Sequence, residues 1–183
     1  DGELKANFIK AEKAIARSLR DPLFQEYMSG EKQVIMTGEL FGSKWKIKMD
    51  SYHPGRAIVD LKYMQSLTKF GYVPDIGYLD FVRYWGYDLQ GAIYQEIVYQ
   101  NTGKRLPFYI AGISKEEAMN IEVIYIHDNY LKEAMKVIES RMPRILQVKY
   151  HGAKPDRCEQ CIWCRDTKVL TKPIGIGDLT ASL

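Results

Sequence analysis

The spacing of apolar positions changes several times along this chain, and each change predicts a different element. Apolar side chains recur every three or four positions over residues 1–29, which predicts an amphipathic helix that Asp21 and Pro22 interrupt. Three runs with strand-like patterns follow, separated by short turns: residues 32–40, 45–50 and 57–64. Their alternation and β-branched content predict a meander of three antiparallel strands.

The second half of the chain combines long helical periods with short apolar runs. Residues 65–78 contain Gly71, Pro74 and Gly77, so we expect a loop there. Beyond it we expect a helix, two strands and a second helix, in this order: residues 79–101, 107–113, 121–126 and 129–150. The whole order predicts an α/β (α+β) fold, with a central mixed sheet flanked by helices.

Composition limits the class of protein without choosing a function. The 183 residues are enough for one domain with a real core, and 46% apolar with 27% charged residues is ordinary for a soluble globular protein. A net charge of +3 permits a nucleic-acid partner without indicating one. No apolar run approaches the roughly 20 residues of a membrane helix. We therefore expect a cytoplasmic protein with no membrane partner.

Two aspartates and a lysine mark the predicted meander as a place for chemistry. Asp50 ends the second predicted strand, Asp60 lies in the third, and Lys62 shares a strand face with Asp60. A hairpin would bring the two carboxylates together, where they repel unless a cation lies between them. Carboxylate oxygens suit Mg²⁺ or Mn²⁺, which can activate water for attack on a phosphodiester. The alternative is an ordinary surface ion pair.

A second motif follows on the predicted helix, in YDLQGAIYQEIV, where Gln90 and Tyr94 lie four positions apart and therefore on one face. Taken alone, this pair is typical of the polar edge of a packing helix. Together with the upstream D-x9-D-x-K, it resembles the PD-(D/E)XK nucleases, most closely the RecE (exonuclease VIII) branch of phage-type and RecB-like exonucleases. The resemblance implies a restriction-endonuclease-like αβββαβ core.

The resemblance also implies a role for each matching position. These roles are metal binding by Asp50, Asp60 and the backbone carbonyl of Leu61, catalysis by Lys62, and DNA contact by Gln90 and Tyr94. The family has a further acidic residue or histidine on an upstream helix. No convincing equivalent stands before Gly30, and Glu31 and Glu39 are weak substitutes, although Glu39 could approach the site from a turn. Residues 1–150 are thus expected to be a nuclease core that lacks its upstream helix.

The implied function is a Mg²⁺-dependent deoxyribonuclease of phage or prophage type, encoded by a bacterium or a phage. Such an exonuclease degrades one strand of double-stranded DNA, starting from its ends, for recombination. The resemblance further implies a ring-shaped homo-oligomer and a single-strand annealing recombinase as partner. The alternative is a non-catalytic DNA-binding module that keeps the fold. A third possibility is a metal-stapled structural protein unrelated to DNA.

The C-terminal extension, residues 151–183, carries three closely spaced cysteines: Cys158, Cys161 and Cys164. This spacing suits a thiolate-bound metal better than a disulfide framework. One interpretation is Zn²⁺, with His151 or His127 as the fourth ligand. The resemblance to RecB-like nucleases implies instead a [4Fe-4S] cluster whose fourth ligand lies outside this chain, although the last gap is narrower than usual in that group. An empty, reduced loop is the remaining alternative.

Aromatic residues are frequent close to the proposed site in the sequence. They could stack on a frayed DNA end, or they could simply pack against the core. The residues are Tyr63, Tyr72, Tyr78, Tyr84, Trp85 and Tyr87.

Overall fold

The computed structural model describes residues 6–73, 76–159 and 161–177 of the chain. The chain forms two compact units, Asp1–Met142 and Pro143–Leu183. No helix in the described ranges is long and apolar enough to cross a membrane.

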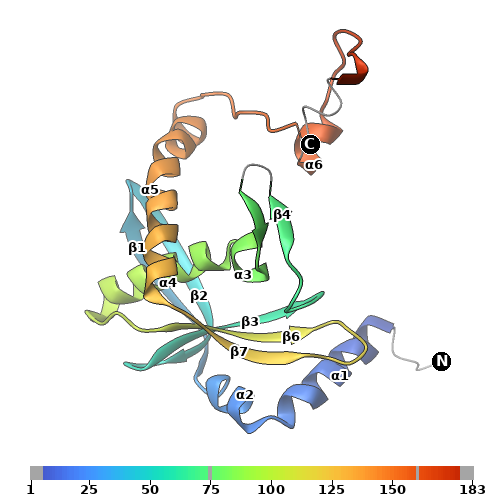
Figure 1. Ribbon diagram of the computed structural model, residues 1–183. Coiled ribbons are helices and arrows are strands. Elements are labelled where there is room, and N and C mark those ends of the chain that lie inside the picture. Colours follow the sequence, from blue (N-terminus) through green and yellow to red (C-terminus); the bar gives the residue numbers. More distant parts are fainter. Residues whose placement is uncertain (1–5, 74–75, 160, 178–183) are drawn as a thin grey trace, which may run out of the picture. The chain divides into compact units, whose positions relative to one another are not determined.

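A five-stranded mixed sheet forms the centre of the first unit (Figure 1). Its strands lie in the order β1 (Glu31–Leu40), β2 (Ser43–His53), β3 (Ala57–Met64), β6 (Phe108–Ser114) and β7 (Ile121–Ile126). The first three pair antiparallel, as the meander predicted, while β3 pairs parallel to β6 and β6 pairs antiparallel to β7. The mixed sheet flanked by helices confirms the predicted fold class.

Helices cover both faces of this sheet (Figure 1). The first face carries α1 (Ala6–Leu19) and α2 (Pro22–Tyr27), whose Ala14 and Phe24 are buried in a cluster with Val59 of β3 and Ala111 of β6. The break between these helices falls at Asp21, whose carboxylate caps α2 by accepting a hydrogen bond from the backbone N–H of Phe24 at 2.9 Å.

The opposite face carries α4 (Tyr87–Thr102) and the beginning of α5 (Asp128–Tyr150). Because side chains alternate along a strand, β3 directs Val59 to the first face and its neighbours Ile58 and Asp60 to this one. A carboxylate in the middle strand therefore faces α4.

Two predictions for the middle of the chain were wrong. The expected loop contains two short antiparallel strands, β4 (Gly71–Val73) and β5 (Gly77–Leu79), which are too short to show a clear period. The expected single helix is divided into α3 (Phe81–Tyr84) and α4. The division falls at Gly86, which has the left-handed φ of 68° that glycine adopts without strain. A further short helix, α6 (Ile162–Asp166), lies in the second unit.

Gly91 lets α4 lie close to the sheet. A Cβ at this position would stand 2.6 Å from the ring of Phe108, which is fully buried and has no room to move. We expect Gly91→Val to lower the free energy of unfolding by about 3 kcal/mol, the upper end of the usual range for overpacking. Urea denaturation measures this change. Tyr99→Val, on the exposed side of the same helix, should cost about 1 kcal/mol or less. Equal stability of the two variants would contradict the packing described.

Candidate functional site

The site forms where β2 and β3 separate. Their ladder of paired residues ends at Ser51 and Val59, so Asp50 and Asp60 occupy the next positions on the two strands. With no partner on β2 beyond this point, the backbone N–H of Leu61 donates instead to Oδ2 of Asp50, at 2.9 Å. The end of the ladder thus places one carboxylate on each branch of a fork.

Asp60 lies at the inner end of this fork and is only 3% exposed. Its Oδ1 accepts a hydrogen bond from Nε2 of Gln90 at 2.8 Å, and its Oδ2 lies 2.5 Å from the ammonium nitrogen of Lys62. Lys62 also donates to Oε1 of Gln90 at 2.9 Å. The three side chains therefore form a closed network in which each contacts the other two.

Burial dominates the electrostatics of Asp60. Loss of hydration raises the pKa of this carboxyl above its ordinary value, and the negative charge of Asp50 raises it further. Lys62 and Gln90 act in the opposite direction without cancelling the effect of burial. Asp50 is thus close enough to Asp60 for the two carboxylates to repel each other. The site therefore holds a carboxylate, Asp60, whose ionised form is disfavoured by burial.

Gln90 and Tyr94 both connect α4 to the sheet. The amide of Gln90 has a fixed orientation, because its N–H must face a carboxylate and its oxygen an ammonium. The hydroxyl of Tyr94 donates to the backbone carbonyl of Lys48 in β2 at 3.0 Å, and its ring packs edge-on against Phe108. Gln90 thus positions Asp60 and Lys62, while the predicted contact of both residues with DNA stays a prediction.

Two further residues complete the surroundings: Gln33, which the sequence pattern did not identify, and Tyr87, which was expected only as one of several nearby aromatic residues. Gln33 of β1 donates from Nε2 to Oδ1 of Asp50 at 2.9 Å, and its backbone has a left-handed φ of 55°, which is uncommon for a non-glycine residue. The ring of Tyr87 lies 4.4 Å from the Lys62 ammonium, a cation–π contact. Tyr87 stands three positions before Gln90 and so shares its helix face, a signal that was present in the sequence. No comparable signal marked Gln33.

The acidic side chains offer what a small divalent cation requires. The buried Oδ2 of Asp60 has the ammonium of Lys62, at 2.5 Å, as its one partner among the residues described. Together with the half-buried carboxylate of Asp50, it supplies hard oxygen donors suited to Mg²⁺ or Mn²⁺. The residues therefore fit the expected cation, and Asp60 is the more deeply buried of the two donors. A contribution from the carbonyl of Leu61 stays a prediction.

The expectation that Glu39 could approach the site was wrong. Glu39 pairs with Lys44 near the turn between β1 and β2, six positions along β2 from Asp50, which is roughly 20 Å in an extended strand. In the described ranges, the cysteines form the only group of three or more metal-ligating side chains. The two aspartates are thus not joined there by a third carboxylate or a histidine.

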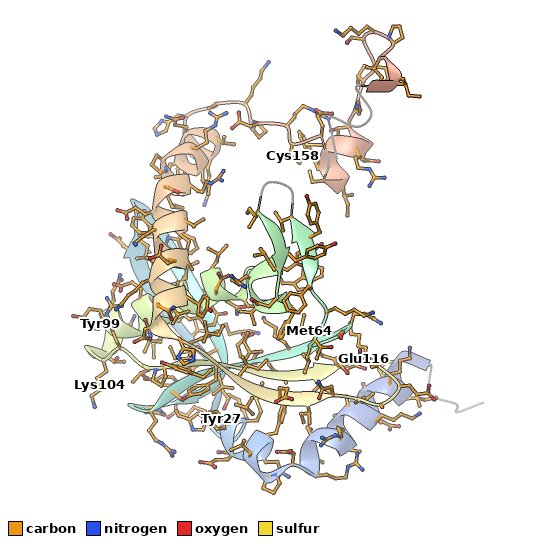
Figure 2. All side chains as sticks on the ribbon, in the orientation of Figure 1. Tyr27, Met64, Tyr99, Lys104, Glu116 and Cys158 are labelled. Atoms are coloured by element: carbon orange, nitrogen blue, oxygen red, sulfur yellow. The ribbon has the colours of Figure 1, made fainter. Side chains whose placement is uncertain are left out.

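In the second unit, the three cysteines gather around the start of α6, near the position of Cys158 labelled in Figure 2. Their sulfur atoms all lie within 4.8 Å of one another. The backbone N–H of Cys161 donates to the sulfur of Cys158 at 3.3 Å, and that of Cys164 donates to the sulfur of Cys161 at 3.4 Å. The N–H of Cys164 favours the thiolate of Cys161, but the two neighbouring thiols and the loss of hydration outweigh it, so the pKa of Cys161 lies above its ordinary value. The group includes neither His151 nor His127.

Comparisons with known proteins agree with this geometry. A family described as a PDDEXK-like domain of unknown function (DUF3799) matches residues 1–167. The crystal structure of a proposed exonuclease from Eubacterium rectale is 65% identical in sequence and has a TM-score of 0.91 to this chain. The match covers 100% of this chain and 68% of that one. No curated protein matches the sequence.

The buried charge of Asp60 leads to a test in the absence of metal. Because its pKa is raised, the ionised carboxylate at neutral pH opposes folding, so Asp60→Asn should raise the midpoint of thermal unfolding in EDTA. Asp50→Asn is the matched control. It weakens hydrogen bonds from Gln33 and Leu61 at a half-buried position, so it should not raise the midpoint. A lower midpoint for Asp60→Asn than for wild type would contradict this account of the site.

Proposed function

Since this chain belongs to the family of PDDEXK-like domains described as DUF3799, we propose that it is a metal-dependent deoxyribonuclease. Asp50 and Asp60 would bind the cation and Lys62 would be the catalytic lysine. The observation that carries the proposal is the buried carboxylate of Asp60, which lies 2.5 Å from the ammonium of Lys62 and next to Asp50 where β2 and β3 separate. A buried ion pair of this kind often contributes little to folding stability, and a divalent cation would compensate the combined charge of the two carboxylates.

Each side chain has a distinct part in the proposed reaction. When bound, a divalent cation supplies positive charge to the phosphodiester and makes water a stronger nucleophile. Lys62 would orient the attacking water or stabilise the negative charge that develops on the phosphate. Gln90 keeps Lys62 and Asp60 at fixed positions before the substrate arrives, so little reorganisation is needed during the reaction. Asp50 would hold the cation from the other branch of the fork.

The finer assignment is an exonuclease that acts on the ends of double-stranded DNA with Mg²⁺. The description of the Eubacterium rectale relative supports the exonuclease assignment. The likeness of the D-x9-D-x-K, Gln90 and Tyr94 pattern to RecE-type enzymes supports degradation of one strand in phage-type recombination. On the same likeness, we propose a homo-oligomer that works in the bacterial cytoplasm with a single-strand annealing recombinase.

One observation favours a second candidate, a DNA-binding module without catalysis. Among the described residues, no third metal-ligating side chain joins Asp50 and Asp60. Two protein carboxylates are nevertheless a usual number for Mg²⁺, which keeps several waters and takes ligands from substrate phosphates. Cleavage measured together with DNA binding separates the two candidates, because a module would bind DNA and leave it intact.

Two substitutions test the reactive residues. Asp60→Asn and Lys62→Met should each lower the rate of DNA cleavage in Mg²⁺ or Mn²⁺ by at least about 10²-fold, the usual cost of losing one stabilising group. Lys46→Met, on an exposed position of β2, is the control and should keep close to the wild-type rate. A gel assay on end-labelled duplex DNA gives the rates. Full activity in either site variant would refute the assignment.

The same variants separate metal binding from catalysis. Mn²⁺ should raise the midpoint of thermal unfolding of wild type and of Lys62→Met, because a ligand that binds only the folded state stabilises it. It should have little effect on Asp60→Asn, which lacks the more deeply buried of the two donors. An equal rise in all three proteins would mean that Mn²⁺ binds elsewhere.

For the cysteines we propose one structural metal ion. Sulfurs bound to a single tetrahedral ion at about 2.3 Å lie roughly 3.8 Å apart, and those of Cys158 and Cys164 are separated by 3.8 Å. A [4Fe-4S] cluster binds each thiolate through a different iron, so its sulfurs must stand farther apart. The spacing therefore favours Zn²⁺ over a cluster. The fourth ligand would be His151, a water or a group outside this chain.

Metal analysis of the purified protein tests this site. We expect about one zinc per chain, with most of it lost in Cys161→Ser and in Cys164→Ser. Preparation without oxygen preserves a cluster if one is present. Iron at several equivalents per chain, with visible absorption that fades in air, would overturn the zinc assignment.

A further inference from the structure

An aromatic groove of about 490 Å³ lies in the first unit beside the proposed site. It runs between the end of β3, where Met64 is labelled in Figure 2, and the segment from β4 to α4. Its principal aromatic residues are Phe70, Tyr84, Trp85 and Tyr87, and its cationic residues are Lys69 and Lys115. No aspartate or glutamate belongs to the lining. The charged side chains of the lining are therefore all cationic, which suits an anionic ligand.

The aromatic rings of the groove are unusually accessible. Phe70 is 65% exposed, Trp85 62% and Tyr84 42%, although large apolar side chains are normally covered in a folded protein. Contiguous exposure of this kind marks a binding surface. The volume falls within the range of about 300–1,000 Å³ of sites for small ligands, which suits nucleotides better than another folded domain.

The rings are also held in place before any ligand binds. Tyr84 and Trp85 contact each other edge-on, with ring centroids 5.3 Å apart. The backbone of β4 at Gly71 lies directly against the Tyr84 ring, so closely that a Cβ would collide with it. Beneath them, Phe81 is buried with Met64 and Leu67 in a small apolar cluster. A preset surface of this kind loses little freedom when a flat ligand stacks on it.

Tyr87 connects the aromatic groove to the proposed reactive residues. It lines the groove, and its ring carries the Lys62 ammonium at 4.4 Å. Lys115, also in the lining, lies over the ring of Tyr63 at 5.1 Å, and its backbone N–H donates to the carbonyl of Met64 at 2.7 Å. Two cations thus contact aromatic rings of the groove, and one of them is the proposed catalytic lysine.

We propose that the aromatic groove binds unpaired nucleotides of the DNA strand whose phosphodiester lies at Asp60 and Lys62. This inference rests on the proposed nuclease function. Bases stack on aromatic faces regardless of sequence, because every base has a π-face, while lysines contact the phosphates. Fully paired bases offer no free face to these rings. The preferred substrate would therefore be an end whose strand is single-stranded or readily separated.

Binding without cleavage gives the first test. A fluorescein-labelled single-stranded DNA of ten nucleotides is titrated with the full chain in EDTA, and anisotropy is measured. Trp85→Ala should bind about tenfold more weakly, the order expected for one lost stacking contact, and Trp85→Phe should recover much of the affinity. Tyr99→Ala removes an exposed aromatic outside the groove and is the matched control, with unchanged affinity. Equal binding by Trp85→Ala and wild type would overturn the proposal.

Cleavage in Mn²⁺ gives the second test, on two duplexes that differ only at one end. One end carries a short unpaired tail and the other is fully paired and rich in G·C. Wild type should cut the tailed end faster, and Trp85→Ala should lose this preference while keeping the metal-induced rise in thermal stability. An unchanged preference in Trp85→Ala would overturn the proposal.

The two proposals fail in different ways. Suppose that wild type and Tyr99→Ala bind the oligonucleotide more tightly than Trp85→Ala does, while none of the proteins cleaves DNA. In that case the groove inference stands and the nuclease function falls. If all variants cleave DNA at one rate and without regard to the end, the nuclease function stands and the groove inference falls.

Discussion

The structure depends on one unfavourable arrangement, a carboxylate buried in the middle of a sheet. Asp60 lies on β3, the strand with antiparallel β2 on one side and parallel β6 on the other, and is 3% exposed. The elements around it compensate only in part. Lys62 supplies a counter-charge at 2.5 Å and Gln90 supplies a hydrogen bond, yet burial still raises the pKa of the carboxyl above its ordinary value. Buried charge left incompletely satisfied is costly, and proteins retain it where a ligand completes it.

The fork between β2 and β3 explains why this site forms where it does. A continuous ladder would hold the strands together through Asp50 and Asp60 and leave no room between them. Because pairing stops at Ser51 and Val59, the two carboxylates occupy diverging branches. The backbone N–H of Leu61 donates a hydrogen bond to the side chain of Asp50 instead. Gln33 donates a hydrogen bond to the other oxygen of the Asp50 carboxylate. Its backbone has a left-handed φ, a strained conformation that is frequent at functional sites.

Much of this arrangement was predictable from local sequence, and the remainder was not. The alternation in WKIKMD and the turn before AIVDLKYM were enough to place β2, β3 and the shared face of Asp60 and Lys62. The four-residue spacing of Gln90 and Tyr94 placed them correctly on one helix. The contact of Gln33 with Asp50 could not be predicted, because it depends on the left-handed backbone of Gln33 itself, which no periodicity reveals. The sequence pattern also did not predict the helix division at Gly86 or the hairpin of β4 and β5. Three-residue strands and a four-residue helix are shorter than the window in which a pattern can be read.

The central claim is that Asp50 and Asp60 bind one divalent cation, and a direct measurement is anomalous diffraction from crystals of the chain soaked in Mn²⁺. We expect one strong anomalous peak, within coordination distance of Oδ2 of Asp60 and of an oxygen of Asp50. A map with no peak at Asp60, at Mn²⁺ concentrations that support DNA cleavage, would contradict the claim.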